Sequence, residues 1–376
     1  MKLSVIILNY NVCNFLRQAI LSVQSAIKNI EAEIIIIDNN SPDDSCAMVR
    51  AEFPELLLIE NKENIGFGRA NNQAVEHAKG EFICILNPDT AVAADVFEKC
   101  LDFIEATPDC GAIGVRLIDG TGNYLPESKR NLPTPSVSLS KITGSKNQHN
   151  TYYANHVAED GVGTVTVLPG AFMFMRRSLY NKVGGFDKAF FMYGEDIDLS
   201  YSIEKAGYKN YYLGSAYVLH YKGESTQQDK EYLDRFYGAM HIFYKKHFSK
   251  NLLQDGLIYL GIEGTKFLKS FSLRKKKTDL PTIKTIYLLS EDQEFYERLK
   301  AYYSQPIHQL KLKERSELDL ENTKVIWDAN EYEYDVILKN MRRYSSNGVR
   351  FRIRPRNTWQ LIGSDRSDEK GSVVNV

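Results

Sequence analysis

The sequence predicts an α/β protein with a mixed, mainly parallel central sheet, followed by a smaller α/β domain. Two observations support this prediction. Between residues 3 and 89, short apolar runs alternate with segments of helical spacing, which is the pattern of successive βαβ units. After Pro281 a similar alternation returns over a shorter stretch, so a second sheet is expected there.

Each strand of the first region is a continuous apolar run, as a sheet covered on both faces requires. The expected strands are 3–8, 33–38, 55–60 and 81–89. The helices expected between them are 14–28, one opened by the polar turn 38–45, and 68–80, closed by Gly80. A strand–turn–strand is expected at 164–178 and a helix at 197–205. Right-handed crossovers then bring the carboxyl ends of the strands to one edge, where ligands of such sheets bind.

Shifts in pattern divide the chain into three parts: 1–250, 251–277 and 278–376. Within the first part, the stretch 120–160 is rich in Pro, Ser, Asn and Gly and is expected to be a long loop. The third part is expected to be a small Rossmann-like domain with strands in IKTIYLL, VIW and VRFRIRP and a helix in YDVILKNMRRYS.

Composition excludes several classes of protein. The 376 residues are 43% hydrophobic and 25% charged, with a formal net charge of −1, which argues against a dedicated nucleic-acid binder. Five cysteines without CxxC spacing favour buried free thiols in a reducing compartment. We recognise no signal peptide after Met1 and no apolar run near the ~20 residues of a membrane span. A cytoplasmic protein is therefore expected.

Polar residues follow the predicted strands at the ligand-binding edge. Asn9 and Tyr10 end the first strand, Asp38 ends the second, and NPD at 87–89 ends the fourth. Acids and amides gathered there predict a site for a polyhydroxylated or nucleotide ligand. The alternative is that Asp38 merely caps the next helix. For Asp38 together with Asp89 we favour a functional role.

The glycine patterns GxGxxG and GxxxxGK[ST] are both missing from the sequence. A nucleotide diphosphate would therefore need its charge neutralised in another way. A divalent metal held by Asp89 is the natural candidate, because Mg²⁺ typically takes one or two carboxylates plus phosphate oxygens. His220 is predicted as a further ligand, although a lone histidine is more often packed or at the surface. Lys222 could contact phosphate directly.

Seven segments in order resemble one family. They are SVIILNYN, IIIIDNNSPDDS, NKENIGFGRANNQA, CILNPDT, LPGAFMFMRRS, VGGFDKAFFMYGEDIDLSYSIEKAGYK and HYKGEST. Together they closely resemble the inverting glycosyltransferases of family 2, and within them the rhamnosyltransferase-like branch. The resemblance covers roughly residues 3–250. It implies the GT-A fold, in which a nucleotide-binding α/β half precedes an acceptor-binding half.

The resemblance also implies roles for particular residues in binding the donor. It places Asn9 and Asp38 at the nucleoside. The predicted donor-binding residues are Asn9, Tyr10, Asp38, Asn64, Gly66, Gly68, Asn71 and Asn87. The NPD at 87–89 stands at the family's DxD position, where the last acid, Asp89, meets the Mg²⁺ or Mn²⁺ that bridges the diphosphate. Asn in the first position removes one charge.

The stretch GEDIDLS at 194–200 crowds three carboxylates within four positions. By the resemblance, Asp196 is the catalytic base and Glu195 positions it or contacts the acceptor. A displacement with inversion does need a carboxylate to deprotonate the attacking hydroxyl. Asp198 is expected to start a helix. The preceding Phe190, Phe191 and Tyr193 offer faces for sugar stacking, and core packing is the nearly equal alternative.

The predicted function is transfer of a sugar from a nucleotide donor to a hydroxyl of a glycan or lipid-linked acceptor in surface polysaccharide synthesis. The predicted donor is dTDP-L-rhamnose, with UDP-galactose or UDP-galactofuranose as alternatives. A glycosidase would need a second acid at the scissile bond and no nucleotide pocket. A nucleotide-sugar-binding or scaffold subunit without turnover is the other alternative, and the retained Asp89 and Asp196 argue against it.

The part from 251 to 277 carries an apolar stripe at helical spacing and ends in RKKK at 274–277. It is typical of a helix that lies on an anionic membrane at the inner face of the cell membrane. Packing between the domains or a homodimer contact explains it equally well. The C-terminal domain is expected to be non-catalytic, although Ser364, Asp365 and Ser367 could form a ligand loop.

Overall fold

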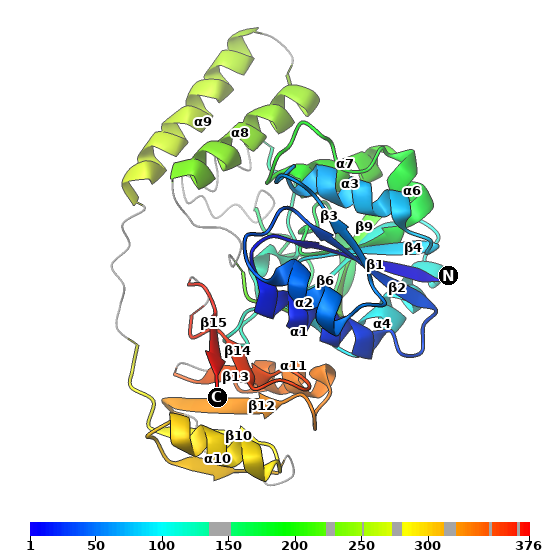
Figure 1. Ribbon diagram of the computed structural model, residues 1–376. Coiled ribbons are helices and arrows are strands. Elements are labelled where there is room, and N and C mark those ends of the chain that lie inside the picture. The colour runs from blue at the N-terminus through cyan, green and yellow to red at the C-terminus, as the bar shows by residue number, and fades with distance from the viewer. Residues whose placement is uncertain are drawn as a thin grey trace.

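A computed structural model describes residues 1–134, 152–222, 230–249, 252–272, 280–311, 321–345, 348–366 and 369–376. Two sheets organise the chain (Figure 1). The first has the order β3-β2-β1-β4-β8-β6-β9-β5, with β7 paired to β9. Its strands are β1 (Leu3–Asn9), β2 (Ala32–Asp38), β3 (Leu57–Glu60), β4 (Phe82–Leu86), β5 (Thr90–Val92), β6 (Cys110–Ile118), β7 (Val162–Val165), β8 (Phe172–Arg176) and β9 (Lys209–His220).

The first sheet is mixed, because β8 runs antiparallel to both of its neighbours, β4 and β6. β1, β2, β3 and β4 are mutually parallel, as the apolar runs predict. The predicted fold class is thus confirmed for this sheet. Several predicted bounds differ by a few residues, and helix α3 ends at His77 rather than at Gly80. Gly80 instead lets the backbone before β4 lie close to β1, since a Cβ there would lie 2.5 Å from the Ser4 nitrogen.

Alternating side chains of the strands build a core on each face of the sheet. Leu3, Val5 and Ile7 pack against one set of helices, and Ile6 and Leu8 pack against the other. The first set is α1 (Cys13–Ala26), α2 (Ser45–Glu52) and α4 (Val96–Ala106), and the second is α3 (Phe67–His77), α6 (Arg177–Lys182) and α7 (Glu195–Lys205). The cores include Cys84, Cys100 and Cys110, which are buried free thiols as predicted.

Two helices follow the first sheet, α8 (Lys230–His247) and α9 (Leu252–Ser272), and they pair as a hairpin (Figure 1). The basic run 274–277 lies outside the described residues. Within the part of the chain that is described, no helix is long and apolar enough to cross a membrane.

The second sheet has the order β11-β10-β12-β13-β14-β15. Its strands are β10 (Thr285–Leu289), β11 (Ile307–Gln309), β12 (Thr323–Asp328), β13 (Arg350–Arg354), β14 (Gln360–Gly363) and β15 (Ser372–Asn375), and its helices are α10 (Gln293–Tyr302) and α11 (Tyr334–Arg343). The first four strands in that order are parallel, and β14 and β15 add antiparallel pairs. A second, smaller α/β sheet was predicted here and is confirmed.

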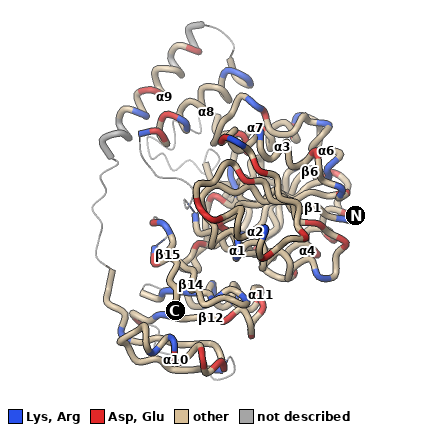
Figure 2. Tube along the Cα trace, viewed as in Figure 1, with Lys and Arg blue, Asp and Glu red and all other residues tan. Residues whose placement is uncertain are grey.

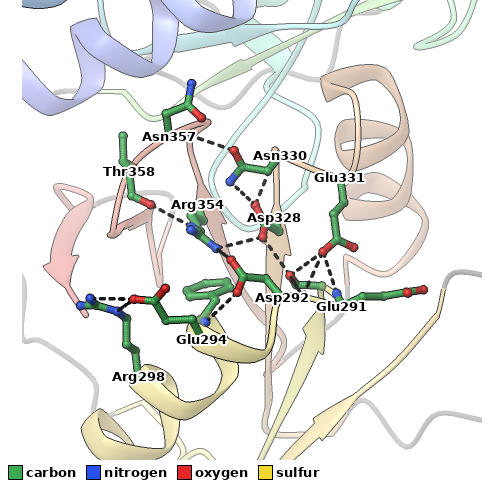
Figure 3. Close-up of polar contacts among 12 residues, drawn as sticks. Glu291, Asp292, Glu294, Arg298, Asp328, Asn330, Glu331, Arg354, Asn357 and Thr358 are labelled. Atoms are coloured by element: carbon green, nitrogen blue, oxygen red, sulfur yellow. Dashed lines mark hydrogen bonds and ion pairs between the residues drawn. The ribbon is translucent and has the colours of Figure 1, made fainter.

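The carboxyl edge of this second sheet is filled by its own side chains (Figure 3). Arg354 donates to Asp292 at 2.8 Å and to Asp328 at 3.1 Å, and its guanidinium lies 4.2 Å from the ring centroid of Trp359. Asp328 also accepts two hydrogen bonds from Asn330. Because each charge is met by a neighbour, this network is explained as a structural one.

A shared hydrophobic core joins the two sheets. Phe15 and Tyr221 of the first part belong to the same buried cluster as Trp327, Tyr334 and Met341 of the second. Polar contacts surround the cluster, including Arg17 to Gln360 at 2.8 Å and Arg342 to the Tyr217 hydroxyl at 2.9 Å. The second sheet with α10 and α11, called the second domain below, therefore has a fixed place beside β5 and β9.

Candidate active site

A cleft of about 1040 Å³ opens at the carboxyl ends of the parallel strands. This is the edge at which open α/β sheets bind ligands. Of the predicted site residues, the cleft is lined by Tyr10, Asn64, Asn87, Asp89, Glu195, Asp196 and His220. These come from the ends of β1, β4 and β9, the start of α7, and the loop after β3.

Asp89 and His220 lie side by side in this cleft although 131 positions separate them. The pairing of β5 with β9 explains this, because it sets Thr90 opposite His220. His220 Nε2 is 3.4 Å from Asp89 Oδ1 and 3.4 Å from Asn87 Nδ2. The NPD turn and the end of β9 therefore present one carboxylate, one imidazole and one amide to the same point.

These two side chains suit a divalent ion that is completed by a ligand. No group of three or more His, Cys, Asp or Glu able to share an ion occurs among the residues that are described. Mg²⁺ commonly takes one or two carboxylates and leaves its other positions to phosphate and water, and Mn²⁺ likewise prefers oxygen ligands. Asp89 thus fits an ion whose other positions are filled by phosphate and water, with His220 close enough to add a nitrogen ligand.

The chain turns sharply just before α7. Tyr193 and Gly194 both have positive φ, +68° and +80°, so Glu195 and Asp196 enter the first helical turn at the cleft. Such strained backbone often occurs at functional sites. Glu195 is buried, and its Oε2 has no hydrogen-bonding partner in the described structure. Burial, reinforced by the adjacent Asp196 carboxylate, raises the pKa of Glu195 well above the ordinary value.

Asp196 is held by a cation that the sequence did not indicate. Arg130 Nη2 donates to Asp196 Oδ2 at 2.5 Å, and the Gly170 amide donates to the same oxygen at 3.2 Å. Asp196 Oδ1 accepts only from the Ile197 amide, at 2.8 Å, among the described contacts. Arg130 also lines the cleft. It lies in the stretch that we predicted only as a loop, where no periodic pattern marks it.

Five predicted donor-binding residues are not among those lining the cleft. Asn9 donates to Asp38 at 2.7 Å, and Asp38 accepts from the amide and hydroxyl of Ser41, so these residues fix the turn after β2. The other three serve packing of α3. Gly66 lies against the Phe191 carbonyl, Gly68 lies against Phe186, and Asn71 donates to the Phe67 carbonyl within the helix.

The aromatic residues before α7 were predicted either to stack on a sugar or to pack in the core, and they differ in their surroundings. Phe190 is buried against Ala239 and Phe243, so packing explains it. Phe191 is 39% exposed. Tyr193 lines the cleft, with its ring 5.2 Å from that of Tyr232.

Asp198 lies in the first turn of α7 and connects α7 to α8. It is buried and bonds to His247 at 2.6 Å and to Lys246 at 2.9 Å. Lys246 and His247 both belong to α8, so these two contacts fix α8 against α7.

Residues 4–184 match the model of the family described as glycosyl transferase family 2. Residues 4–184 therefore belong to glycosyl transferase family 2. The chain is 29% identical over 210 residues to an N-acetylglucosaminyl-diphospho-decaprenol L-rhamnosyltransferase of Mycobacterium tuberculosis, which covers 52% of this chain and 68% of that protein. It is 27% identical over 166 residues to the rhamnosyltransferase WbbL of Escherichia coli K12, covering 42% of this chain and 61% of the relative.

A solved mannosyltransferase from Pyrobaculum calidifontis, in complex with GDP-Man and Mn²⁺, aligns with a TM-score of 0.48 and 19% identity. The alignment covers 72% of this chain and 71% of that one. The predicted family is confirmed for residues 4–184, and the predicted mixed, mainly parallel sheet is the one described above.

Proposed function

We propose that this chain transfers a sugar, with inversion, from a nucleoside-diphosphate donor to an acceptor hydroxyl. The observation that supports this most directly is the meeting of two groups in one cleft, the Asp89–His220 pair and the Asp196 carboxylate. The first group suits a cation that neutralises diphosphate, and the second suits removal of a proton. A single cleft with both is what direct displacement at an anomeric carbon needs.

In this proposal Asp196 accepts the proton of the attacking hydroxyl. Its Oδ2 is engaged by Arg130 and Gly170, so Oδ1 is the oxygen that takes the proton. Arg130 fixes the carboxylate in the cleft. A divalent ion held by Asp89 and His220 would offset the charge that develops on the departing diphosphate. Tyr10, Asn64 and Asn87 line the same cleft, and in this proposal they contact the nucleotide.

A second cavity of about 270 Å³ adjoins the cleft and fits an acceptor sugar. It shares Glu127, Tyr152, Lys222, Tyr232 and Phe236 with the main cleft and adds Tyr153, Leu233 and Tyr237. Aromatic faces beside a Lys222–Glu127 ion pair can stack on a sugar ring and hydrogen-bond its hydroxyls. We propose that the acceptor binds there.

For the donor we propose dTDP-L-rhamnose, supported by the two relatives that are named rhamnosyltransferases. The test is a thermal-shift screen of nucleotide sugars with and without Mg²⁺ or Mn²⁺, because a ligand of the folded state raises the melting temperature. Turnover with the best donor should then give a product of inverted anomeric configuration by NMR. Binding without turnover would favour the alternative of a nucleotide-sugar-binding subunit.

We also propose that α9 contacts an anionic membrane surface. Its polar side chains face α8: Glu263 meets His241 at 2.9 Å and Lys266 meets Asp234 at 2.7 Å. Two of its large apolar side chains are exposed to solvent, Leu260 by 68% and Phe267 by 64%. A helix pair in water usually has the opposite arrangement, whereas an interfacial helix places its apolar face in lipid.

A further inference from the structure

The second domain reaches the main cleft through the connection between β14 and β15. Glu369 and Lys370, which lie on this connection, are among the residues that line the cleft. The family match ends at residue 184, so it includes neither of them. Figure 2 shows charged positions of both signs on this connection, beside β15.

The connection is anchored at its base. Asp365 forms an ion pair with Arg352 at 2.7 Å, and both Arg352 and Arg350 belong to β13. Ser364 is buried and donates to the Arg366 carbonyl at 2.6 Å. Glu369 lies 3.6 Å from Arg366. These contacts tie the described residues on either side of the connection to the second sheet.

The connection also packs directly on a turn of the first domain that lines the cleft. A Cβ on Gly120 would lie 2.6 Å from Ser364 Cβ, so the turn and the connection are in direct contact there. Asp119 closes this turn by accepting from the amides of Thr121 and Asn123. Asp119 and Asn123 themselves line the cleft. The turn and the connection therefore form adjoining parts of one wall.

The charge of the cleft indicates what this wall supplies. The first domain contributes five carboxylic acids to the lining: Asp89, Asp119, Glu127, Glu195 and Asp196. Among the described residues, the first domain also contributes Arg130 and Lys222 to the lining. Each forms an ion pair with one of those acids. A nucleoside diphosphate brings further negative charge. The second domain adds Lys370, whose side chain is exposed, and Glu369 to the lining.

We propose that the second domain completes the catalytic cleft and that Lys370 binds the diphosphate of the donor. This inference rests on the proposed transferase function and extends it to a residue outside the family match. Lysine commonly acts in this way, as a mobile point charge against phosphate. The second domain then affects donor affinity in addition to packing on the first.

The test compares K370E, K370A and K370R with K339E, because Lys339 is an exposed lysine of the same domain that does not line the cleft. Titration calorimetry with TDP, UDP, thymidine and uridine in Mg²⁺ measures affinity, and steady-state kinetics measure donor KM and kcat. We expect K370E to weaken diphosphate binding and raise donor KM by about tenfold or more. K370R should keep near-native values, and nucleoside binding and kcat should change little.

Equal dissociation constants for TDP and UDP in K370E and K339E would overturn the role of Lys370 and leave the proposed function standing. A rise in acceptor KM alone would overturn it as well, because the proposal assigns Lys370 to the donor. A wild-type chain that binds neither diphosphate would overturn both proposals. Melting temperatures of all four variants should match that of the wild type, since both lysines are exposed.

Discussion

Replacing Asp196 by Asn tests the base assignment and the ion pair together. The variant keeps the size of the side chain and the N–H contact from Gly170, but it removes the charge opposite Arg130. Arg130 is only 12% exposed and Asp196 only 15%, so the remaining guanidinium has little access to water. Loss of one partner of a buried pair costs about 3–5 kcal/mol, and partial exposure reduces this to about 1–3 kcal/mol here.

Activity and stability should respond differently to this change. Loss of a general base typically lowers kcat by about 10²–10⁴-fold, while donor affinity should be retained. The melting temperature should fall by about 2–4 °C or less per kcal/mol lost. Progress curves with the donor selected by the thermal-shift screen measure the first effect, and scanning calorimetry measures the second.

The double variant R130M/D196N separates the two effects. Without either charge, no uncompensated ion remains, so stability should return toward that of the wild type while activity stays low. E195Q serves as the matched control at the neighbouring position. Wild-type kcat in D196N, with a large loss in E195Q, would refute our assignment and make Glu195 the base.

Three further predictions address the rest of the site and its surroundings. Because the pKa of Glu195 is raised in the folded state, wild-type stability should fall as pH rises above about 4.3 toward the raised value, and E195Q should lack this fall; a difference in melting temperature that does not vary with pH would contradict this. D89N and H220Q should each raise, by about tenfold or more, the concentration of Mn²⁺ plus nucleoside diphosphate that gives half of the full thermal shift. An unchanged concentration would contradict the proposed metal site. Reversing the charges of residues 274–277 should lower co-sedimentation with anionic vesicles but not with neutral ones, and equal binding would remove the membrane contact.

The sequence predicted the strands and site residues that depend on a short local pattern. Apolar runs such as 3–8 predicted buried strands, and Asn87 and Asp89 were predicted as site residues because they end such a run. The site residues that these patterns predicted and that line the cleft all lie at strand ends, in the loop after β3 or at a helix start.

The sequence was uninformative where tertiary contacts decide. Arg130 pairs with a carboxylate 66 positions away, from a stretch with no strand or helix period. Lys370 reaches the cleft only because a shared core fixes the second domain against β5 and β9. Asn9, Asp38 and Asn71 were predicted to bind the donor, and the structure shows them hydrogen-bonded to other residues of the chain. No spacing rule in a single sequence separates these cases.

The antiparallel strand β8 limits how the cleft can open. It hydrogen-bonds to β4 on one side and to β6 on the other, so a single uninterrupted sheet forms the floor of the cleft from β4 to β6. A hinge between the halves would have to break that floor. Entry of substrates and escape of the spent nucleotide must therefore depend on movements of the segments above the floor, and the floor itself should remain among the amides slowest to exchange with deuterium.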